Sequence, residues 1–217
     1  LYTAAGFGQA PKIGFPGAVA GTLHPHKKWV PSDQARIAFG YGISASLFQV
    51  ARAYTIFARD GELVPLTIER SPEFKPGTPV ISAKTAIEMR SMLESVTEPG
   101  GTAIKAQAEG FRVGGKTGTA HKLVGKGYGN KYRAYFVGLA PISAPRIVVA
   151  VMIDEPTGGS HYGGDVAAPV FSTIVSETLH TLNVLPDAKV KQMVLENKTP
   201  EEIRTANAQA QHAVLKR

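Results

Sequence analysis

Apolar residues recur at helical spacing in two stretches of the first hundred residues, and each stretch follows a serine. Ser46 and Gln49 form a capping-box pattern, in which each side chain bonds a backbone N–H that the helix leaves free. This pattern predicts a helix that continues to about Phe57 and is closed by Gly61. Ser82 is the predicted cap of a second helix. The apolar face of that second helix carries Met89, Met92, Leu93 and Val96.

Glycine and proline interrupt the rest of the first half, which predicts little regular structure there. The chain opens on a short stretch that reads as the end of a helix closed by Gly6. Residues 1–40 are otherwise expected to be irregular, with short elements. Residues 62–70 are predicted to be a short strand that leads into a loop, and residues 102–108 a short helical turn.

Apolar stretches in the second half predict three β-strands, at 112–121, 132–140 and 147–153. The tight connection Ser143-Ala144-Pro145 indicates that the last two strands form an antiparallel hairpin. Residues 122–131 contain three glycines and are predicted to be a loop.

A last core helix is expected from about residue 165 to 182. The residues predicted to face the core are Ala167, Val170, Phe171, Ile174 and Thr178. The expected fold class is therefore α+β, with helices packed on an antiparallel sheet.

Composition indicates an ordinary globular domain. The chain has 217 residues, 43% of them hydrophobic and 19% charged, which suits one domain or the larger part of one. The domain is expected to span residues 1–183. Residues 184–217 are predicted to form a polar, partly helical tail, with Thr199 as a cap and Pro200 at the first helical position. Because the sequence opens at Leu1 within an element, we expect it to be part of a longer protein.

Charge and residue types exclude several kinds of site. The net charge is +7, but the positive residues lack the basic stripe and interleaved aromatic residues of a nucleic-acid-binding protein, so no nucleic-acid partner is expected. The chain has no cysteine, which excludes disulfides and thiolate metal sites. His24 and His26 form a pair without a third ligand. We therefore expect neither a metal site nor a cofactor.

The most informative segment begins at Gly110 and has two interpretations. Gly110, four further residues and Gly115-Lys116-Thr117 match the phosphate-binding pattern G-x4-G-K-[ST]. The apolar stretch before Asp154 also resembles the strand that presents a magnesium-binding acid in nucleotide hydrolases. A phosphate-binding loop, however, lies between a buried strand and a helix that begins at the lysine. Helix is predicted before Gly110 and several glycines follow Lys116, so a P-loop nucleotide hydrolase is disfavoured.

The second interpretation is a substrate-binding strand built on the Lys-Thr-Gly triplet Lys116–Gly118, found in penicillin-binding proteins and serine β-lactamases. The triplet alone is common by chance, but other blocks accompany it in order. These blocks are Gly40–Gly42, Gln49–Tyr54, Tyr132–Pro141, Val151–Pro156 and Tyr162–Phe171. Over about residues 1–183 the chain resembles the transpeptidase domain of class B penicillin-binding proteins, especially the division-specific enzyme of Gram-negative bacteria.

The resemblance implies an α/β sandwich of the penicillin-binding and β-lactamase-like type, here incomplete, and a serine acyltransferase. In this family the serine attacks the penultimate D-Ala carbonyl of a peptidoglycan stem peptide, and β-lactams trap the acyl-enzyme. Lys116 is the implied proton-transfer and anion-attracting residue, and the Thr119 N–H the implied oxyanion donor. The implied substrate-binding residues are Thr117, Gly118, Thr119, Tyr128, Tyr162, Gly163 and Gly164.

Two motifs of the resembled family are missing, because the chain contains neither S-x-x-K nor S-x-N. The resemblance places both motifs before the region where this sequence begins. The nucleophilic serine is therefore expected in an N-terminal part of the same protein, and the chain alone is not expected to form an acyl-enzyme. A serine β-lactamase or β-lactam sensor is an alternative, and so is a non-catalytic peptidoglycan-binding module.

The resemblance also implies partners and a location. The expected ligands are stem peptides ending in D-Ala-D-Ala and β-lactam antibiotics, and the expected protein partners are division proteins. The expected location is the periplasmic face of the bacterial inner membrane, at the division septum.

Overall fold

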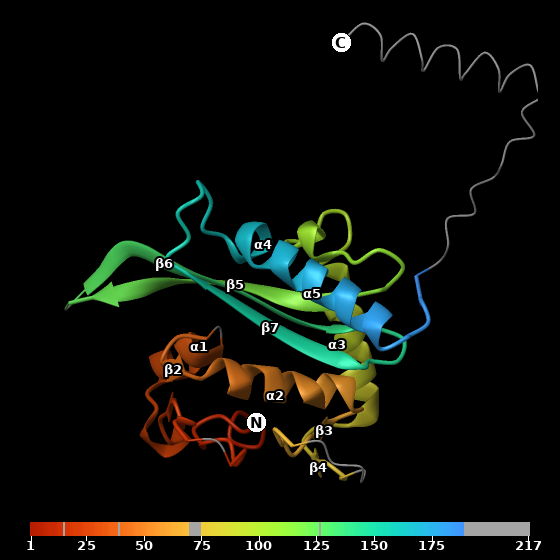
Figure 1. Cartoon of the computed structure of the whole chain (residues 1–217). Coiled ribbons are helices and arrows are strands. Elements are labelled where there is room, and N and C mark those ends of the chain that lie inside the picture. The colour runs from red at the N-terminus through yellow and green to blue at the C-terminus, as the bar shows by residue number, and fades with distance from the viewer. Residues whose placement is uncertain (15, 39, 70–74, 126, 189–217) are drawn as a thin grey trace, which may run out of the picture.

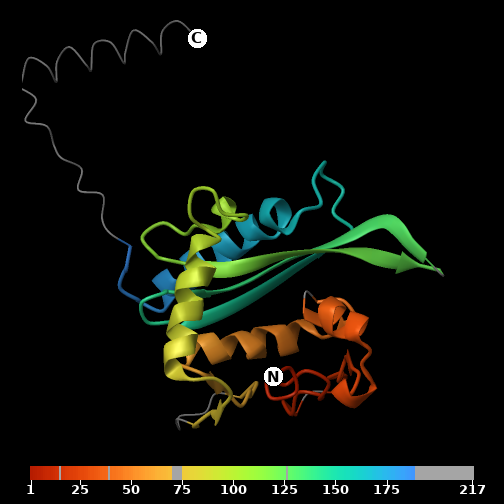
Figure 2. The same ribbon diagram turned by 180° about the vertical axis from the view of Figure 1, so that it is seen from behind.

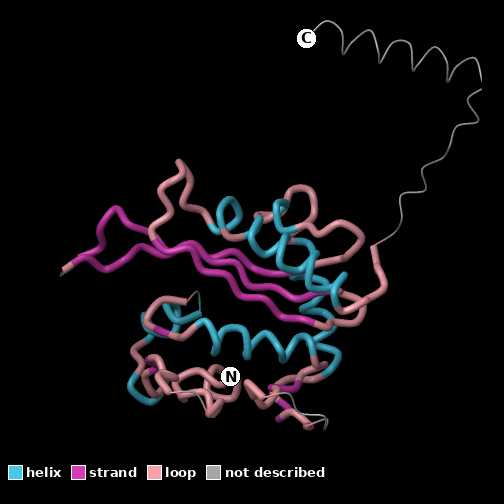
Figure 3. The backbone as a smooth tube through the Cα atoms, viewed as in Figure 1, coloured by secondary structure: helices cyan, strands magenta, loops and turns pink. Residues whose placement is uncertain are grey.

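The computed structural model describes residues 1–14, 16–38, 40–69, 75–125 and 127–188. They form an α+β fold in which a three-stranded antiparallel sheet lies between helical layers (Figures 1 and 3), so the predicted fold class is confirmed. No helix in these ranges is both long and apolar enough to cross a membrane. In chain order the elements are β1 (Thr22–Leu23), η1 (His26–Lys28), α1 (Pro31–Ala38), β2 (Ile43–Ser44), α2 (Leu47–Ala58), β3 (Glu62–Leu63), β4 (Thr78–Pro79), α3 (Ala83–Ser95), η2 (Ile104–Ala106), β5 (Gly114–Val124), β6 (Gly127–Ala140), β7 (Ile147–Asp154), α4 (Gly163–Val166) and α5 (Ala168–Thr181).

The central sheet has the strand order β5–β6–β7, and both pairings are antiparallel. Helix α5, together with α4 and η2, covers one face, and α2 and α3 pack against the other side (Figure 2). The N-terminal segment lies on the far side of α2 from the sheet (Figure 1). The predicted hairpin is confirmed, because β6 pairs with β7 from Ala140 opposite Ile147 to Arg133 opposite Asp154.

The larger core lies between the sheet and α5. Phe136 of β6 and Phe171 of α5 are fully buried and meet edge to face, with ring centroids 4.7 Å apart. Edge-to-face packing of two buried rings adds to the stabilisation that their burial provides. This contact fixes α5 across the strands that carry the candidate site.

The last helix differs from its prediction in two ways. It is interrupted at Ala167, so that the short α4 precedes α5. Its buried stripe is also different: Ala167 and Phe171 are buried as predicted, but Val175 and Leu179 are fully buried in place of Val170 and Ile174, which are 39% and 41% exposed. Both stripes are apolar in the sequence, so the sequence pattern does not distinguish them.

A second core lies between the sheet, α2 and α3. Its buried residues and their packed neighbours include Leu93, Leu139, Ile142, Tyr54 and Phe57. Burial raises the pKa of Tyr54 to about 12, because the ionised phenolate would lose its hydration. Met92 was predicted to face this core but is 62% exposed, so only part of the predicted face of α3 packs inward.

Gln49 joins the N-terminal segment to α2. The predicted capping box is confirmed: the Ser46 N–H donates to Gln49 Oε1 at 2.9 Å, and the Gln49 N–H donates to Ser46 Oγ at 3.3 Å. The side-chain amide of Gln49, which is only 2% exposed, donates to the carbonyls of Gly6, Gln9 and Ala20. One buried side chain therefore satisfies the helix start and three loop carbonyls.

Two predictions for the first half are corrected and one is confirmed. Residues 31–38 form α1, because Pro31 suits the first helical position and the Asp33 carboxylate accepts from the Val30 N–H at 3.0 Å. The opening residues form a turn closed by Gly6 (φ 90°) rather than a helix end. The short strand predicted at the start of 62–70 is confirmed as β3, which ends before Pro65, a residue that cannot donate to a strand ladder.

Residues 122–131 also differ from the prediction of a loop. Strands β5 and β6 continue through this segment as a long hairpin, and pairing reaches Val124 opposite Gly127. Lys122 donates to Asp154 at 2.9 Å and to Glu155 at 2.7 Å, and Lys131 donates to Glu155 at 2.8 Å. These ion pairs connect the hairpin to the end of β7, and two of the three glycines of the segment are accommodated within β6.

The predicted tail from residue 184 is described as far as Ala188, and its helix start at Thr199 lies outside the described residues. The described part is attached to the domain. The Asp187 carboxylate accepts from the Arg112 N–H at 2.7 Å and from the Ser143 hydroxyl at 2.7 Å. Beside it, Arg112 forms a two-bond ion pair with Glu94, each bond 2.6 Å long, which joins α3 to the start of β5.

We predict that Gln49→Ala destabilises the domain by about 3 kcal/mol, because it leaves a helix N–H and several buried carbonyls without partners. The measurement is urea unfolding of the full-length protein. Gln34→Ala, at an exposed position of α1, is the matched control and should change the free energy of unfolding by less than about 0.5 kcal/mol. Equal effects of the two substitutions would contradict the assigned role of Gln49.

We predict that the ion pairs at the hairpin make stability depend on pH in the acid range. Bonds from Lys122 lower the pKa values of Asp154 and Glu155, whose ordinary values are 3.8 and 4.5. A depressed pKa stabilises the fold above the ordinary value, and this contribution is lost as the pH falls through the lower, folded-state value. The melting temperature of Asp154→Asn/Glu155→Gln should therefore lie below wild type at pH 7, with the difference shrinking towards pH 3. Glu109→Gln, at an exposed position, is the matched control. A melting-temperature difference that is the same at pH 7 and pH 3, or an equal difference in the control, would contradict this prediction.

Candidate active site

Strand β5 lies at an edge of the sheet and carries the Lys-Thr-Gly motif. Within the described residues it pairs with β6 alone. Side chains alternate between the two faces of a strand, so Thr117 and Thr119 share the face covered by α4 and η2, whereas Lys116 and Gly118 lie on the opposite face. The motif therefore presents two hydroxyls on one face, while the Lys116 side chain starts on the other face and reaches round the same edge, where its Nζ donates to Thr117 Oγ1 at 3.4 Å.

The hydroxyls of Thr117 and Thr119 each have a defined neighbour. The Gly163 N–H donates to Thr119 Oγ1 at 3.2 Å, and Thr102 Oγ1 lies 3.2 Å from Thr117 Oγ1. Because the Thr119 oxygen accepts this backbone bond, its own hydrogen can be donated elsewhere. Two hydroxyls on one side of a strand edge suit an acceptor with two oxygens, such as a carboxylate.

Lys116 lies along the strand edge. Its Nζ donates to the carbonyl of Thr117 at 3.0 Å, which places that carbonyl at the open edge. In an antiparallel ladder the N–H and C=O of every second residue point to the same side. The Thr119 N–H therefore points to the same edge, where it can donate to a group that lies alongside the strand.

The sheet face that carries Lys116 is partly open. Tyr135 lies opposite Gly118 on this face, and Met152 of β7 lies opposite Tyr135. Met152 is 42% exposed, which is unusual for a methionine on the face of a sheet that other helices cover. This end of the face has room for further packing.

Glycines of α4 allow close approach to the strand. A Cβ on Gly163 would overlap the carbonyl oxygen of Tyr135, and one on Gly164 would overlap the carbonyl oxygen of Thr102. Gly118 is different, since a Cβ there would only touch the Tyr135 side chain, at 3.5 Å. The fold therefore requires glycine at 163 and 164 but not at 118, where its absence of a side chain leaves space beside the strand.

A cleft of about 480 Å³ lies between α4, η2 and the edge of β5. Its lining comprises Gly101, Thr102, Ile104, Lys105, Thr117, Thr119, Tyr162, Gly163, Gly164 and Asp165. Lys105 of η2 and Asp165 of α4 form an ion pair of 2.7 Å between the two walls. Tyr162, which is 60% exposed, stands at the rim.

Four rings form a row beside the cleft. Tyr132 of β6 stacks on His161 with centroids 3.8 Å apart and an interplanar angle of 14°. His121 of β5 adjoins Tyr132 at 4.4 Å, and Tyr162 adjoins His161 at 4.5 Å. The row connects the hairpin to the segment before α4. The side chain of Tyr128, a predicted substrate-binding residue on the same hairpin, lies outside the described part of the chain.

The geometry excludes the phosphate-binding interpretation. Lys116 lies inside strand β5, not at the start of a helix, and the backbone of this strand takes part in the sheet ladder. A phosphate-binding loop would instead present several free N–H groups at a helix N-terminus. Asp154, the other half of that pattern, is paired with Lys122 and Arg133.

The structure brings together seven of the eight predicted site residues, all but Tyr128, and adds others. Lys116–Thr119, Gly163 and Gly164 lie around the strand edge, with Tyr162 at the rim. Thr102, Lys105 and Asp165 also line the cleft, and the sequence analysis did not single them out. In the sequence, Thr102 is only a threonine after two glycines, and Lys105 and Asp165 are charged residues far apart in the chain. None of them has a pattern that indicates a site.

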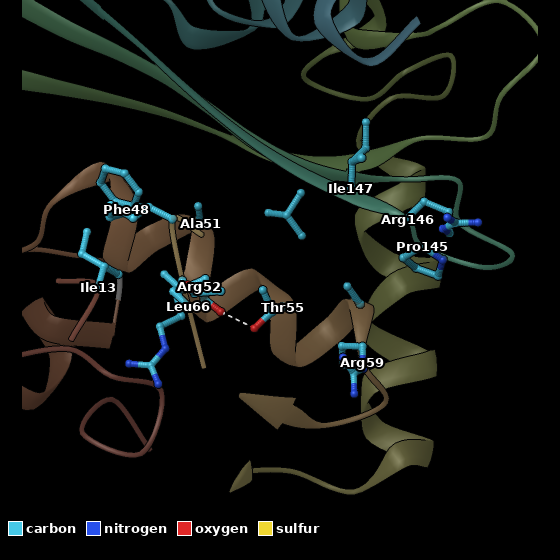
Figure 4. Close-up of a pocket in the computed structure, with 14 residues that line it drawn as sticks. Ile13, Phe48, Ala51, Arg52, Thr55, Arg59, Leu66, Pro145, Arg146 and Ile147 are labelled. Carbon is cyan, nitrogen blue, oxygen red and sulfur yellow. Dashed lines mark hydrogen bonds between the residues drawn. The ribbon is translucent and has the colours of Figure 1, made fainter. Parts of the chain in front are cut away.

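A second cleft, of about 350 Å³, lies between α2 and the start of β7 (Figure 4). It is lined mainly by apolar groups, among them Phe48 and Ile147, with Arg52 and Arg59 on α2 and Arg146 before β7. Phe48 is 55% exposed. This cleft contains no arrangement of acid, base or nucleophile and lies apart from the Lys-Thr-Gly edge.

Comparison with known proteins identifies the family. Residues 1–176 match the family model of the penicillin-binding protein transpeptidase domain. The chain belongs to this family. A probable peptidoglycan D,D-transpeptidase PenA of Neisseria flavescens is 47% identical over 187 residues, covering 86% of this chain and 47% of that protein. The peptidoglycan D,D-transpeptidase FtsI of Escherichia coli K12 is 39% identical over 188 residues, covering 86% and 32%.

A solved structure agrees with the penicillin-binding protein assignment. The apo transpeptidase domain of Burkholderia pseudomallei penicillin-binding protein 3 superimposes with a TM-score of 0.81 at 58% identity, covering 86% of this chain and 57% of that one. The present chain thus spans about a third to a half of these curated relatives and somewhat more than half of this solved domain. The family resemblance inferred from the sequence is confirmed.

We predict that Gly163→Ala displaces α4 from the β5–β6 ladder, because its Cβ would overlap the Tyr135 carbonyl. The bond from residue 163 to Thr119 would then lengthen or break. Gly158→Ala is the matched control, since a Cβ at 158 meets nothing within 4 Å. Hydrogen exchange of residues 160–168 in the full-length protein should increase in the first variant and not in the second. Equal exchange in both would show that the contact does not hold α4.

Proposed function

We propose that this chain is the substrate-binding half of a serine D,D-transpeptidase that cross-links peptidoglycan stem peptides and is acylated by β-lactams. The observation that carries the proposal is the strand edge, where two hydroxyls, one ammonium group and a backbone N–H meet along three residues of β5. The family and the names of its relatives agree with this activity.

In this proposal, the substrate peptide lies along β5 as an added strand. Gly118 leaves room for its backbone, and main-chain bonds to the edge supply affinity. The terminal carboxylate accepts hydrogen bonds from the hydroxyls of Thr117 and Thr119 and is attracted by Lys116. The Thr119 N–H stabilises the negative charge that develops on the attacked carbonyl oxygen. Gly163, Gly164 and Tyr162 shape the wall of the same cleft.

We further propose that the nucleophile comes from another part of the same protein. The chain contains no S-x-x-K and no S-x-N, so it has neither the serine nor its usual basic partner. The missing part would pack on the partly open sheet face beside Lys116, where Met152 is exposed, and against the apolar cleft of Figure 4. Lys116 would then assist proton transfer at the serine.

The wider setting belongs to the same proposal. The resemblance to the division-specific enzymes and the name FtsI of one relative favour a role in septal wall synthesis. The periplasmic face of the inner membrane and contacts with division proteins follow from that role. A serine β-lactamase or a sensor is disfavoured by the transpeptidase names of the relatives.

We predict that a fluorescent penicillin labels the full-length protein and that Lys116→Ala lowers the labelling rate by about 100-fold, the usual scale for loss of a proton-transfer group. Lys84→Ala, at an exposed position of α3, is the matched control and should label like wild type. The isolated chain should not be labelled. Absence of labelling of the folded full-length protein would overturn the proposed activity, and labelling unaffected by Lys116→Ala would remove Lys116 from the site.

A further inference from the structure

One ion pair joins the two walls of the substrate cleft. Lys105 projects from η2, and its Nζ donates to Asp165 Oδ1 of α4 at 2.7 Å. Both residues line the cleft whose floor carries the hydroxyls of Thr117 and Thr119. The two residues are 60 positions apart in the sequence, so the pair exists only because the fold brings the walls together.

Asp165 uses its second oxygen as well. Oδ2 accepts from the Ser160 hydroxyl at 2.8 Å, and the Ser160 oxygen in turn accepts from the Tyr162 N–H at 3.4 Å. The bond from Lys105, and next the bond from Ser160, lower the pKa of Asp165, which keeps the carboxylate ionised at neutral pH. One side chain therefore ties the opposite wall to the turn that carries Tyr162.

Helix α4 is held by its backbone contact with the β5–β6 ladder and by its continuation into α5, and the ion pair adds a side-chain connection to η2. Helix α4 is four residues long, and no side chain caps its N-terminus. Gly163 and Gly164 set how closely it approaches β5 and the carbonyl of Thr102, but they have no side chains that could resist sliding. The Lys105–Asp165 bond supplies a lateral connection, and Ser160 anchors the preceding turn.

We propose that Lys105 and Asp165, with Ser160, form a bracket that positions α4 so that the Gly163 N–H orients the Thr119 hydroxyl towards the substrate carboxylate. The inference rests on the proposed transpeptidase function and adds positioning residues to the same site. These residues act through Thr119 and do not touch the reacting atoms. They set how tightly the carboxylate is bound, whereas the chemical step depends on Lys116 and the nucleophile.

The bracket is suited to act on the site without deciding the fold. The Lys105 and Asp165 side chains are 59% and 40% exposed, and exposed ion pairs contribute little to global stability. Reversing either charge alone brings like charges together across the cleft, whereas reversing both restores the attraction. A charge swap therefore separates the pair from the individual residues.

The experiment uses the full-length protein and a fluorescent penicillin, and it measures the dissociation constant of the first complex separately from the acylation rate constant. Lys105→Asp and Asp165→Lys should each raise the dissociation constant by about tenfold, the effect of losing one hydrogen bond to a charged group. The acylation rate constant should change by less than about twofold. Lys105→Asp/Asp165→Lys should recover most of the lost affinity. Lys84→Asp/Glu88→Lys, which reverses an exposed pair on α3, is the matched control and should bind like wild type.

The outcomes are separable. If wild type is labelled and the single variants bind as well as wild type, with melting temperatures unchanged, the bracket is overturned and the proposed function stands. If the singles bind weakly and the swap restores nothing, the two residues act separately and the bracket is again overturned. A fall in the acylation rate constant alone would place these residues in the chemical step and contradict a positioning role. If the folded wild type is not labelled, the proposed function fails and the bracket fails with it.

Discussion

Direct contact between the backbone of α4 and the β5–β6 ladder is the constraint on which the site depends. Gly163 lies on the ladder where a Cβ would overlap the Tyr135 carbonyl, and Gly164 lies equally close to the Thr102 carbonyl. Interiors pack at a density that leaves no room for even one extra carbon atom at such points. Because α4 approaches so closely, its first N–H reaches Thr119, and the cleft between α4 and η2 is narrow enough for one ion pair to span it.

The chain supplies the expected site residues on one face of the sheet edge but only some of them on the other. On the face of α4 and η2, the hydroxyls, their orienting neighbours and the cleft walls are all present. On the opposite face, Met152 is 42% exposed, and the chain contains no S-x-x-K serine that could be placed against Lys116. In the proposed function these residues would bind the substrate carboxylate, whereas acyl transfer would need a serine placed against Lys116. This asymmetry is the physical reason for proposing that the chain is the binding half of a catalytic site.

Local sequence signals predicted the parts of the fold that local chemistry decides. The Ser46–Gln49 cap, the Ser82 cap and the β6–β7 hairpin follow from nearby side chains and short connections. The hairpin at 122–131 was missed because glycines favour a loop in the local sequence, whereas pairing with the partner strand is a non-local effect. The α5 stripe was misassigned because two apolar stripes compete. In the site, the motif residues were found from their pattern. Thr102, Lys105 and Asp165 were not, since only tertiary packing brings them to β5.

The glycines also explain why a phosphate-binding pattern occurs in a strand. Gly110 adopts φ 81°, a left-handed turn conformation that suits glycine, whereas Gly115 is required because a Cβ would overlap the Val137 carbonyl. Gly110 is therefore needed for a turn and Gly115 for a close contact across the sheet. Together they produce the glycine spacing of a phosphate-binding loop, although neither glycine lies in such a loop. The glycine spacing distinguishes a phosphate-binding loop from a strand only when it is known which groups the backbone N–H groups bond to. In this protein the ladder with β6 uses one side of the strand, and the other side is an open edge, which is the geometry that suits the proposed peptide strand rather than a phosphate.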